Sequence, residues 1–410
     1  MNIVILSNYL PYPLTSGGAQ AQFNMIDELR KEHKISFVFT QEGRNKLSAM
    51  RELQAMWPEV DFFYYSYIRQ LLNPRFLFDK IQRAWGLFFR KKSESFLKER
   101  TLKPYGIYFS RDFVNFVCSI VHKQKADIVQ VEFFPCLEMA KYLSKDVKKI
   151  FIHHEIRYVR NERLLSSLKL TESDRLWMQK VKAKEIEDLN RYDNVVTLTS
   201  IDKDLLVSSG VKVPISVSPA AVNAKVSDYQ EWNGKVCFLG GYDHIPNKEG
   251  VEWFLSSVVP YLKNKSLTDF HIVGKGWPNN IGEGKEIKVT VHGFVEDLSE
   301  AIGGSIMIVP ILTGSGMRMK ILEAAAMSLP MLTTTVGVEG LEYRNEDSCL
   351  IADSPEMFAH ALDRLITDCK LRAYLAKNAN RMFVDKYSIK SLASLRDNVY
   401  SKLFADQTSF

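Results

Sequence analysis

The 410-residue sequence has few cysteines and lacks a long apolar run. Its five cysteines are odd in number and none is paired at metal-ligand spacing, which is typical of buried thiols in a reducing compartment. No uncharged apolar run reaches the roughly 18 residues that span a bilayer. The first residues, MNIVILSNYLP, show neither a basic segment nor a small-residue cleavage site, so they do not resemble a signal peptide. We therefore expect a cytoplasmic protein.

The sequence has little net positive charge outside one stretch. The formal net charge is +6, whereas residues 69–103 alone hold ten Lys or Arg and three Asp or Glu, an excess of +7. The rest is close to neutral, which argues against a nucleic-acid-binding protein. Basic and aromatic residues share the stretch 62–108, predicted to be a helical insertion that attaches peripherally to an anionic membrane. Alternatively, its aromatic side chains fill a core and its basic side chains face water.

Short apolar runs alternate with amphipathic helical stretches, which favours an α/β fold with parallel sheets covered by helices. The predicted strands of a first series cover 2–7, 35–40, 126–131, 149–152 and 194–198, and those of a second cover 215–217, 235–239, 269–273, 289–292, 305–309 and 330–334. Gly210 and Pro214 interrupt the pattern. We predict an N-terminal domain of residues 1–210 and a C-terminal domain of 211–388. Tandem domains of this class are expected to bind a ligand between them, at the carboxyl ends of the strands.

The segment 305–334, SIMIVPILTGSGMRMKILEAAAMSLPMLTT, predicts a strand, a glycine-containing loop, a helix and a strand. The glycines let the backbone approach a ligand, and the amino end of the helix offers free N–H groups to a phosphate. Arg318 and Lys320 add positive charge there, which indicates an anionic ligand. Glu323 is suited to accept hydrogen bonds from both hydroxyls of a ribose. An ordinary strand–loop–helix with surface charges is the alternative.

This segment resembles the donor signature of retaining GT-B glycosyltransferases of family 4, in a sub-branch with a GSGMR-x-K loop. The residues that carry the resemblance are Gly314, Ser315, Gly316, Met317, Arg318, Lys320, Glu323, Ala324, Ala326 and Pro330. Family members carry two glutamates eight residues apart, and the second, which contacts the ribose, corresponds to Glu323. Ser315 stands where the first, often a donor-sugar contact, is expected. Ser315, Arg318 and Lys320 are therefore the candidates for the contact to the sugar in this chain.

The resemblance implies a GT-B fold, in which two Rossmann-like domains face a central cleft and a last helix, 389–410, crosses back to the first domain. It implies transfer of a sugar from a nucleoside-diphosphate sugar, of the UDP or GDP type, to a saccharide or lipid-linked acceptor in surface polysaccharide or glycolipid synthesis. Retention at the anomeric carbon, without a cofactor or a metal, is also implied. A sugar-nucleotide epimerase on the same fold and a non-catalytic sugar-nucleotide-binding protein are the alternatives. A nicotinamide oxidoreductase is disfavoured because the first strand lacks a G-x-G-x-x-G fingerprint.

Three further loops match the family's pattern. They contain Gly17 and Gly18; Gly240 and Gly241 followed by Asn247 and Lys248; and Gly293, Phe294 and Val295. By resemblance, the first loop faces the cleft from the first domain, the second meets the diphosphate through Lys248 or Asn247, and the third meets the nucleobase through its backbone. On the residues alone, a flexible turn and a surface lysine are the alternatives. Asp297 is expected to cap a helix.

Two histidines and a glutamate follow the predicted strand 149–152. His153, His154 and Glu155 are the candidate catalytic residues, because titratable groups at the carboxyl end of a strand often serve chemistry. By resemblance, a histidine here lies near the donor sugar or the acceptor. Which histidine faces the site stays open, as does whether Glu155 supports it or binds the acceptor. Glu132 is either an acceptor contact or a structural carboxylate.

Overall fold

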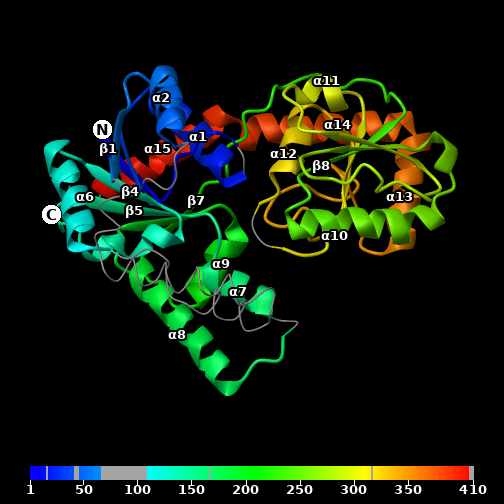
Figure 1. Cartoon of the computed structure of the whole chain (residues 1–410). Coiled ribbons are helices and arrows are strands. Elements are labelled where there is room, and N and C mark those ends of the chain that lie inside the picture. Colours follow the sequence, from blue (N-terminus) through cyan, green and yellow to red (C-terminus); the bar gives the residue numbers. More distant parts are fainter. Residues whose placement is uncertain (15–16, 41–45, 66–108, 166–167, 315–316, 406–410) are drawn as a thin grey trace. The chain divides into compact units, whose positions relative to one another are not determined.

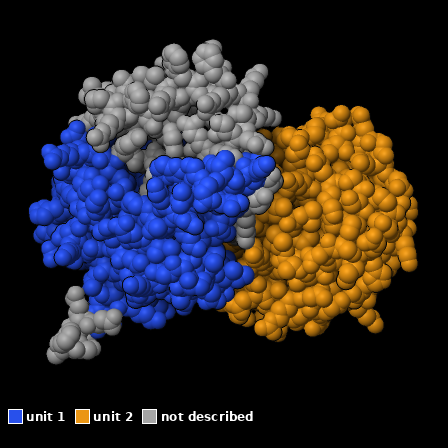
Figure 2. Space-filling model, turned by 90° about the horizontal axis from the view of Figure 1, so that it is seen from below, with its two compact units in different colours: residues 1–219, 393–410 blue, residues 220–392 orange. Residues whose placement is uncertain are grey.

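The computed structural model describes residues 1–14, 17–40, 46–65, 109–165, 168–314 and 317–405. The chain divides into two compact units, coloured separately in Figure 2. Unit 1 comprises Met1–Pro219 and Ala393–Phe410, and unit 2 comprises Ala220–Leu392. Along the described chain, each unit is built on one sheet whose strands all pair in parallel.

Unit 1 contains a seven-stranded sheet in the order β3-β2-β1-β4-β5-β6-β7 in its described part (Figure 1). The strands are β1 (Asn2–Ser7), β2 (Lys34–Thr40), β3 (Asp61–Tyr65), β4 (Ile128–Glu132), β5 (Lys148–His153), β6 (Asn194–Thr197) and β7 (Ile215–Val217). The helices are α1 (Gly17–Leu29), α2 (Lys46–Met56), α6 (Arg111–Lys123), α7 (Arg157–Leu165), α8 (Glu172–Leu189), α9 (Ser200–Ser208) and α15 (Ile389–Ala405), with a 3-10 helix, η1, at Phe134–Lys141. The central strands are buried almost throughout because helices cover both faces. The strand order reverses between β1 and β4.

Strand β3 corrects the prediction of a helix from residue 62 onward. Residues 62–65 pair with β2 as an edge strand. Alternation along the strand buries Tyr65, whose ring packs against Phe113, and exposes Tyr64. A run of aromatic residues favours such a half-buried strand over a helix. The remainder of the basic, aromatic stretch, 66–108, lies outside the described residues.

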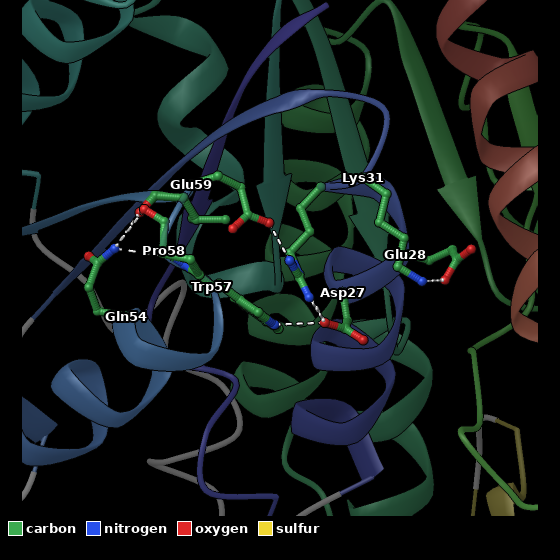
Figure 3. Close-up of polar contacts among 9 residues, drawn as sticks. Asp27, Glu28, Lys31, Gln54, Trp57, Pro58 and Glu59 are labelled. Carbon is green, nitrogen blue, oxygen red and sulfur yellow. Dashed lines mark hydrogen bonds and ion pairs between the residues drawn. The ribbon is translucent and has the colours of Figure 1, made fainter.

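Polar contacts connect α1 with the turn between α2 and β3 (Figure 3). The indole Nε1 of the buried Trp57 donates a hydrogen bond to Asp27 Oδ1 at 2.7 Å. Arg30 pairs with Asp27 at 2.8 Å and also contacts Glu59. Gln54 Nε2 donates to the carbonyl of Val60 at 3.1 Å. These contacts satisfy the polar groups around a large buried indole, and so fix the edge of the sheet.

Helix α15 packs onto unit 1 through side chains of its second half. His33 Nε2 lies 2.6 Å from Asp397 Oδ1, and the ring of His33 meets the ring of Tyr400 edge-on. Arg396, which is buried, donates to Ser218 Oγ at 3.2 Å. The side chain of Tyr400 is fully buried. The core of unit 1 is therefore completed by residues that follow unit 2 in the sequence.

Unit 2 contains a six-stranded sheet in the order β10-β9-β8-β11-β12-β13 within the residues described (Figure 1). The strands are β8 (Lys235–Leu239), β9 (Asp269–Val273), β10 (Lys288–Gly293), β11 (Ile306–Val309), β12 (Met331–Thr333) and β13 (Leu350–Ile351). The helices are α10 (Ile245–Trp253), α11 (Leu298–Ile302), α12 (Met319–Ala326), α13 (Pro355–Thr367) and α14 (Cys369–Met382). Short η helices follow at Phe254–Val258, Val259–Tyr261, Lys265–Leu267 and Phe383–Tyr387. The strand order reverses between β8 and β11.

Helix α10 lies against the carboxyl end of β11 at Gly250. A Cβ atom on Gly250 would lie 2.3 Å from the carbonyl oxygen of Pro310. Nearby, Thr313 Oγ1 donates to Glu249 Oε2 at 2.7 Å, which ties the loop after β11 to the same helix. A glycine at this position thus sets how closely the helix approaches the strand.

Gly250→Ala is expected to lower the free energy of unfolding by about 1–3 kcal/mol, because the new methyl group meets backbone that cannot rotate away. Denaturant unfolding followed by tryptophan fluorescence measures the change. Glu252→Ala, at an exposed position of the same helix, is the control and should change stability by less than about 0.5 kcal/mol. Equal stability of Gly250→Ala and the wild type would contradict the close approach.

Candidate functional site

The predicted residues of unit 2 gather where the strand order reverses. Gly240 and Gly241 follow β8, and the loop that contains Gly314 follows β11, the neighbouring strand. Open parallel sheets bind ligands outside the carboxyl ends of their strands at such a reversal. This end of unit 2 is therefore the candidate ligand site.

A hydrogen-bonded cluster joins the loop after β8 to α10 and α12. Asn247 Nδ2 donates to the carbonyl of Gly241 at 2.9 Å, and Lys320 Nζ donates to Asn247 Oδ1 at 2.8 Å. Lys320 Nζ also lies 4.1 Å from the centre of the Phe238 ring. Gly240 has a φ of +150°, and a Cβ atom there would lie 2.5 Å from Asn247 Nδ2 and 2.9 Å from Lys320 Nζ. Only glycine leaves room for the cluster.

Glu323 and Lys320 are ionisable groups held on one helix in an apolar setting. Glu323 is 8% exposed, whereas Lys320 is half-buried. Burial raises the pKa of Glu323 to about 7, against the opposing effect of Lys320. Burial also lowers the pKa of Lys320 to about 7, with a further contribution from Arg318 and an opposing one from Glu323. Removing ionisable groups from water costs free energy. Groups held at such a cost are typical of a site that a ligand completes.

The loop before α12 lies close to the start of α10. Gly314 has a φ of +112°, and a Cβ atom there would lie 3.3 Å from Pro246 Cγ and 3.4 Å from Arg318 Nη2. Arg318 is the residue that precedes α12, so its guanidinium stands at the amino end of that helix. The helix end and the guanidinium together suit an anion.

Asn247 and Lys248, both proposed for the diphosphate, lie in different surroundings. Asn247 is buried in the cluster with Lys320, whereas Lys248 Nζ lies 3.9 Å from Glu252 Oε1 and 5.2 Å from the Tyr242 ring centre. Ser315 and Gly316 lie outside the described residues, and Met317 packs against the core of unit 2.

The loop after β10 contacts the same region through Gly274. The N–H of Gly274 donates to the carbonyl of Gly293 at 2.7 Å, and a Cβ atom on Gly274 would lie 2.2 Å from the carbonyl oxygen of Gly240. Gly293 follows a bulge in β10 and has a φ of +68°. Phe294 is 63% exposed beside Lys275, and Val295 packs partly against the core.

Asp297 caps α11, as predicted. Its Oδ1 accepts a hydrogen bond from the N–H of Ser299 at 2.8 Å and another from that of Glu300 at 3.2 Å. An N-terminal cap satisfies N–H groups that the helix itself leaves unpaired.

In unit 1, His153 takes part in the packing of α7. Its Nε2 lies 3.1 Å from Glu185 Oε1, and both side chains are almost fully buried. Glu185 also accepts hydrogen bonds from the backbone N–H groups of Arg157 at 3.0 Å and Tyr158 at 3.1 Å. His153 thus orients a carboxylate that holds the first turn of α7.

His154 points to the other face of the strand and has different partners. Its Nε2 lies 2.5 Å from Glu132 Oε2, and its ring stacks on Phe133 at a centroid distance of 4.0 Å and an angle of 13°. Its Nδ1 is buried and has no hydrogen-bond partner among the described residues. Phe133 has a φ of +63°, a strained conformation that is frequent at functional sites. Glu155 pairs with Arg160 at 3.1 Å in a partly exposed position.

The loop after β1 reaches the ring of Phe133. Gly17 begins α1, and a Cβ atom on Gly18 would lie 3.1 Å from the hydroxyl of Tyr9 and 3.3 Å from Phe133 Cε1. The rings of Tyr9 and Phe133 lie 4.6 Å apart. The ends of β1, β4 and β5 thus meet at the reversal of strand order in unit 1. Tyr9 is not among the residues predicted from the sequence, where its only signal is an aromatic residue just after the first strand.

Over the described ranges, no three His, Cys, Asp or Glu side chains form a group that could hold a metal ion. Likewise, among the helices that the structure describes, none has the length and apolar character to cross a membrane.

Residues 233–368 match the family model described as "Glycosyl transferases group 1". This range runs from just before β8 to just after α13, and includes all the candidate donor residues of unit 2. The chain therefore carries a glycosyltransferase domain.

The whole chain has the GT-B fold, with two Rossmann-like units. HepE of Anabaena, in a crystal structure with UDP, is 11% identical, with a TM-score of 0.67 over 98% of this chain and 100% of that one. Sucrose-phosphate synthase of Thermosynechococcus elongatus is 13% identical, with a TM-score of 0.66 over 99% of both chains. At this level of identity the likeness establishes the fold.

A curated protein is also similar in sequence. It is an uncharacterized 44.6 kDa protein in the cps region of Klebsiella pneumoniae, 24% identical over 220 residues. The matched part is 51% of this chain and 56% of the relative, so the chain spans little more than half of that protein's length.

Lys320→Met is expected to change how stability depends on pH. The pKa of Lys320 is lowered in the folded protein, so between about pH 7 and pH 10 the unfolded chain binds more protons, and wild-type stability rises with pH. The variant should lack this contribution, so the wild type should gain stability relative to it over that interval. Urea unfolding at several pH values measures the difference.

Lys377→Met, at an exposed position of α14, is the control and should follow the wild-type pH dependence. Parallel pH profiles for Lys320→Met and the wild type would show that Lys320 is not held in a desolvated site.

Proposed function

We propose that this protein transfers a sugar from a nucleoside-diphosphate sugar to a hydroxyl group of an acceptor, in the synthesis of a surface polysaccharide or glycolipid. The match of unit 2 to the glycosyltransferase model and the GT-B fold support the reaction class. HepE has been crystallised with UDP-glucose, which favours a nucleotide-sugar donor here. The relative in a cps region favours a polysaccharide pathway.

The observation that carries the proposal is the pair of ionisable groups on α12, the buried Glu323 and the half-buried Lys320. Lys320 and Arg318 would bind the diphosphate at the amino end of the helix, and Glu323 would accept hydrogen bonds from the ribose hydroxyls. Cleavage of the donor leaves negative charge on the diphosphate. Fixed positive groups in a dry site stabilise that charge without reorganising, so the transfer would require no divalent metal.

In unit 1, His154 is the candidate for contact with the acceptor. Its Nδ1 lacks a partner among the side chains and backbone groups described, whereas His153 is engaged with Glu185. We further propose retention of configuration at the anomeric carbon, on the resemblance of the donor segment. An epimerase would return an altered nucleotide sugar, and a non-catalytic binding protein would return the donor unchanged.

Glu323→Gln and Lys320→Met should each lower the transfer rate by about a hundredfold or more, because each removes a charge from the donor site. Transfer from radiolabelled UDP and GDP sugars to membrane-derived saccharide or lipid-linked acceptors measures the rate and identifies the product. Glu300→Gln and Lys377→Met, at exposed positions of unit 2, are the matched controls and should keep wild-type rates.

The same assay with EDTA should retain activity. Wild-type rates in both donor-site variants would refute the assigned site. An epimerised donor as the product would show that the protein is an epimerase and not a transferase.

The stretch 66–108 lies outside the described residues, and its role as a peripheral membrane contact is a separate proposal. Its excess of basic and aromatic residues supports binding to anionic lipid. Replacing Arg90, Lys91 and Lys92 by Glu should weaken sedimentation with vesicles that contain phosphatidylserine, and salt should weaken wild-type binding. Replacing Lys370, Lys377 and Arg381 of α14 by Glu is the control with the same change in charge. Absence of vesicle binding by the wild-type protein would refute the proposal.

A further inference from the structure

We propose that Tyr400, Gln130 and Glu132 form a hydrogen-bond relay that fixes the ring orientation and tautomer of His154, so that α15 acts in the chemistry of unit 1. The relay makes Tyr400 and Gln130 positioning residues for the substrate contact that His154 provides. The inference rests on the proposed function for the identity of that substrate, a hydroxyl-bearing sugar.

The relay is continuous, and its hydrogen-bond donors converge on Glu132 from both sides. The hydroxyl of Tyr400 lies 2.5 Å from Gln130 Oε1, an acceptor, so the phenol donates. Gln130 Nε2 then donates to Glu132 Oε1 at 2.6 Å. The second oxygen of Glu132, Oε2, lies 2.5 Å from His154 Nε2. A carboxylate accepts only, so this ring nitrogen carries a proton and donates it.

All three supporting side chains lie inside unit 1. Tyr400 and Gln130 are fully buried, and Glu132 is 2% exposed. Burial raises the pKa of Tyr400 to about 12, so the phenol is neutral and remains a donor. A carboxylate in the interior is costly unless its oxygens are hydrogen-bonded. Gln130 and His154 each satisfy one oxygen of Glu132, and Gln130 in turn depends on Tyr400.

The strand geometry of β4 explains why two polar residues reach one face of the sheet. Gln130 and Glu132 are two residues apart on a strand, so their side chains point to the same side. Helix α15 supplies Tyr400 on that side, 270 residues from Gln130 in the sequence. An apolar residue in place of Gln130 would fill the same space without the cost of burying a polar side chain, so stability alone does not account for the relay.

These contacts leave one ring nitrogen of His154 without a hydrogen-bond partner in the described structure. Phe133 stacks on the imidazole and fixes its plane, while Glu132 holds Nε2. In the neutral ring, Nδ1 is then an acceptor, and it is buried without a partner in the described structure. A sugar hydroxyl that donates to Nδ1 would complete the site. With the opposite tautomer, Nδ1 would be a donor and Nε2 would meet the carboxylate as a second acceptor.

Two variants break the relay at different points. Gln130→Leu removes the donor to Glu132, and Tyr400→Phe removes only a hydroxyl. Gln130→Leu should lower kcat for transfer roughly tenfold, the effect of losing a hydrogen bond to a charged group, and Tyr400→Phe should lower it less. The donor KM and the rise in Tm caused by UDP should not change, because unit 2 is untouched. In ¹⁵N NMR of histidine-labelled protein, the His154 signals are assigned by their absence from His154→Ala. In both relay variants these signals should shift from those of the Nε2–H form to those of a mixture of tautomers.

The controls separate positioning from packing. Tyr192→Phe removes another buried phenol of unit 1, which donates to the carbonyl of Leu137 at 2.6 Å, and should preserve both the tautomer and kcat. In a His154→Ala background, Gln130→Leu should cause no further loss, because the relay then has no ring to orient.

An unchanged His154 tautomer in both relay variants, or an equal loss from Gln130→Leu with and without His154, would overturn the inference. If Gln130→Leu fails to fold, Tyr400→Phe decides. If the wild type transfers no sugar, the proposed function fails, while the NMR experiment still decides whether the relay exists.

Discussion

Much of this structure is arranged around ionisable side chains that are kept out of water at the carboxyl ends of two parallel sheets. Burying a charge costs far more than one hydrogen bond returns, so each such group needs several partners held in place. In unit 2, Lys320 reaches Asn247 and the face of Phe238, while Glu323 is a buried carboxylate on the same helix. The folded protein thus carries an energetic cost that a ligand of suitable charge can offset.

Sheet topology determines where these groups occur. In both units the strand order reverses beside the first strand, between β1 and β4 and between β8 and β11. Loops from neighbouring strands leave in different directions at that point, and short side chains or glycine let them approach. In unit 2, Gly240 and Gly274 let the loops after β8 and β9 meet at distances that no Cβ atom would allow. In unit 1, Gly18 lies against Tyr9 and Phe133, which follow β1 and β4.

The sequence predicted most of the central strands, because fully buried parallel strands are continuous apolar runs. It was wrong about residues 62–65, which were predicted as part of a helical insertion although a run of aromatic residues favours an edge strand. It could not separate Asn247 from Lys248, or His153 from His154, because adjacent residues of a helix or strand point in different directions and only packing decides which faces inward. The decisive partners are distant in sequence, as with Glu185 for His153 and Tyr400 for Gln130. The donor helix could be predicted from the sequence because Arg318, Lys320 and Glu323 lie on one short segment.

The split of unit 1 on either side of unit 2 has a consequence for biogenesis. During synthesis, residues 1–219 leave the ribosome long before residues 393–405, so unit 2 can fold while unit 1 still lacks a helix. Until then, the interior surfaces that receive Tyr400 and Arg396 are exposed to water, and Gln130 has no phenol to accept from. Nascent unit 1 therefore keeps part of its interior open until α15 packs against it, and the candidate site of this unit is completed last.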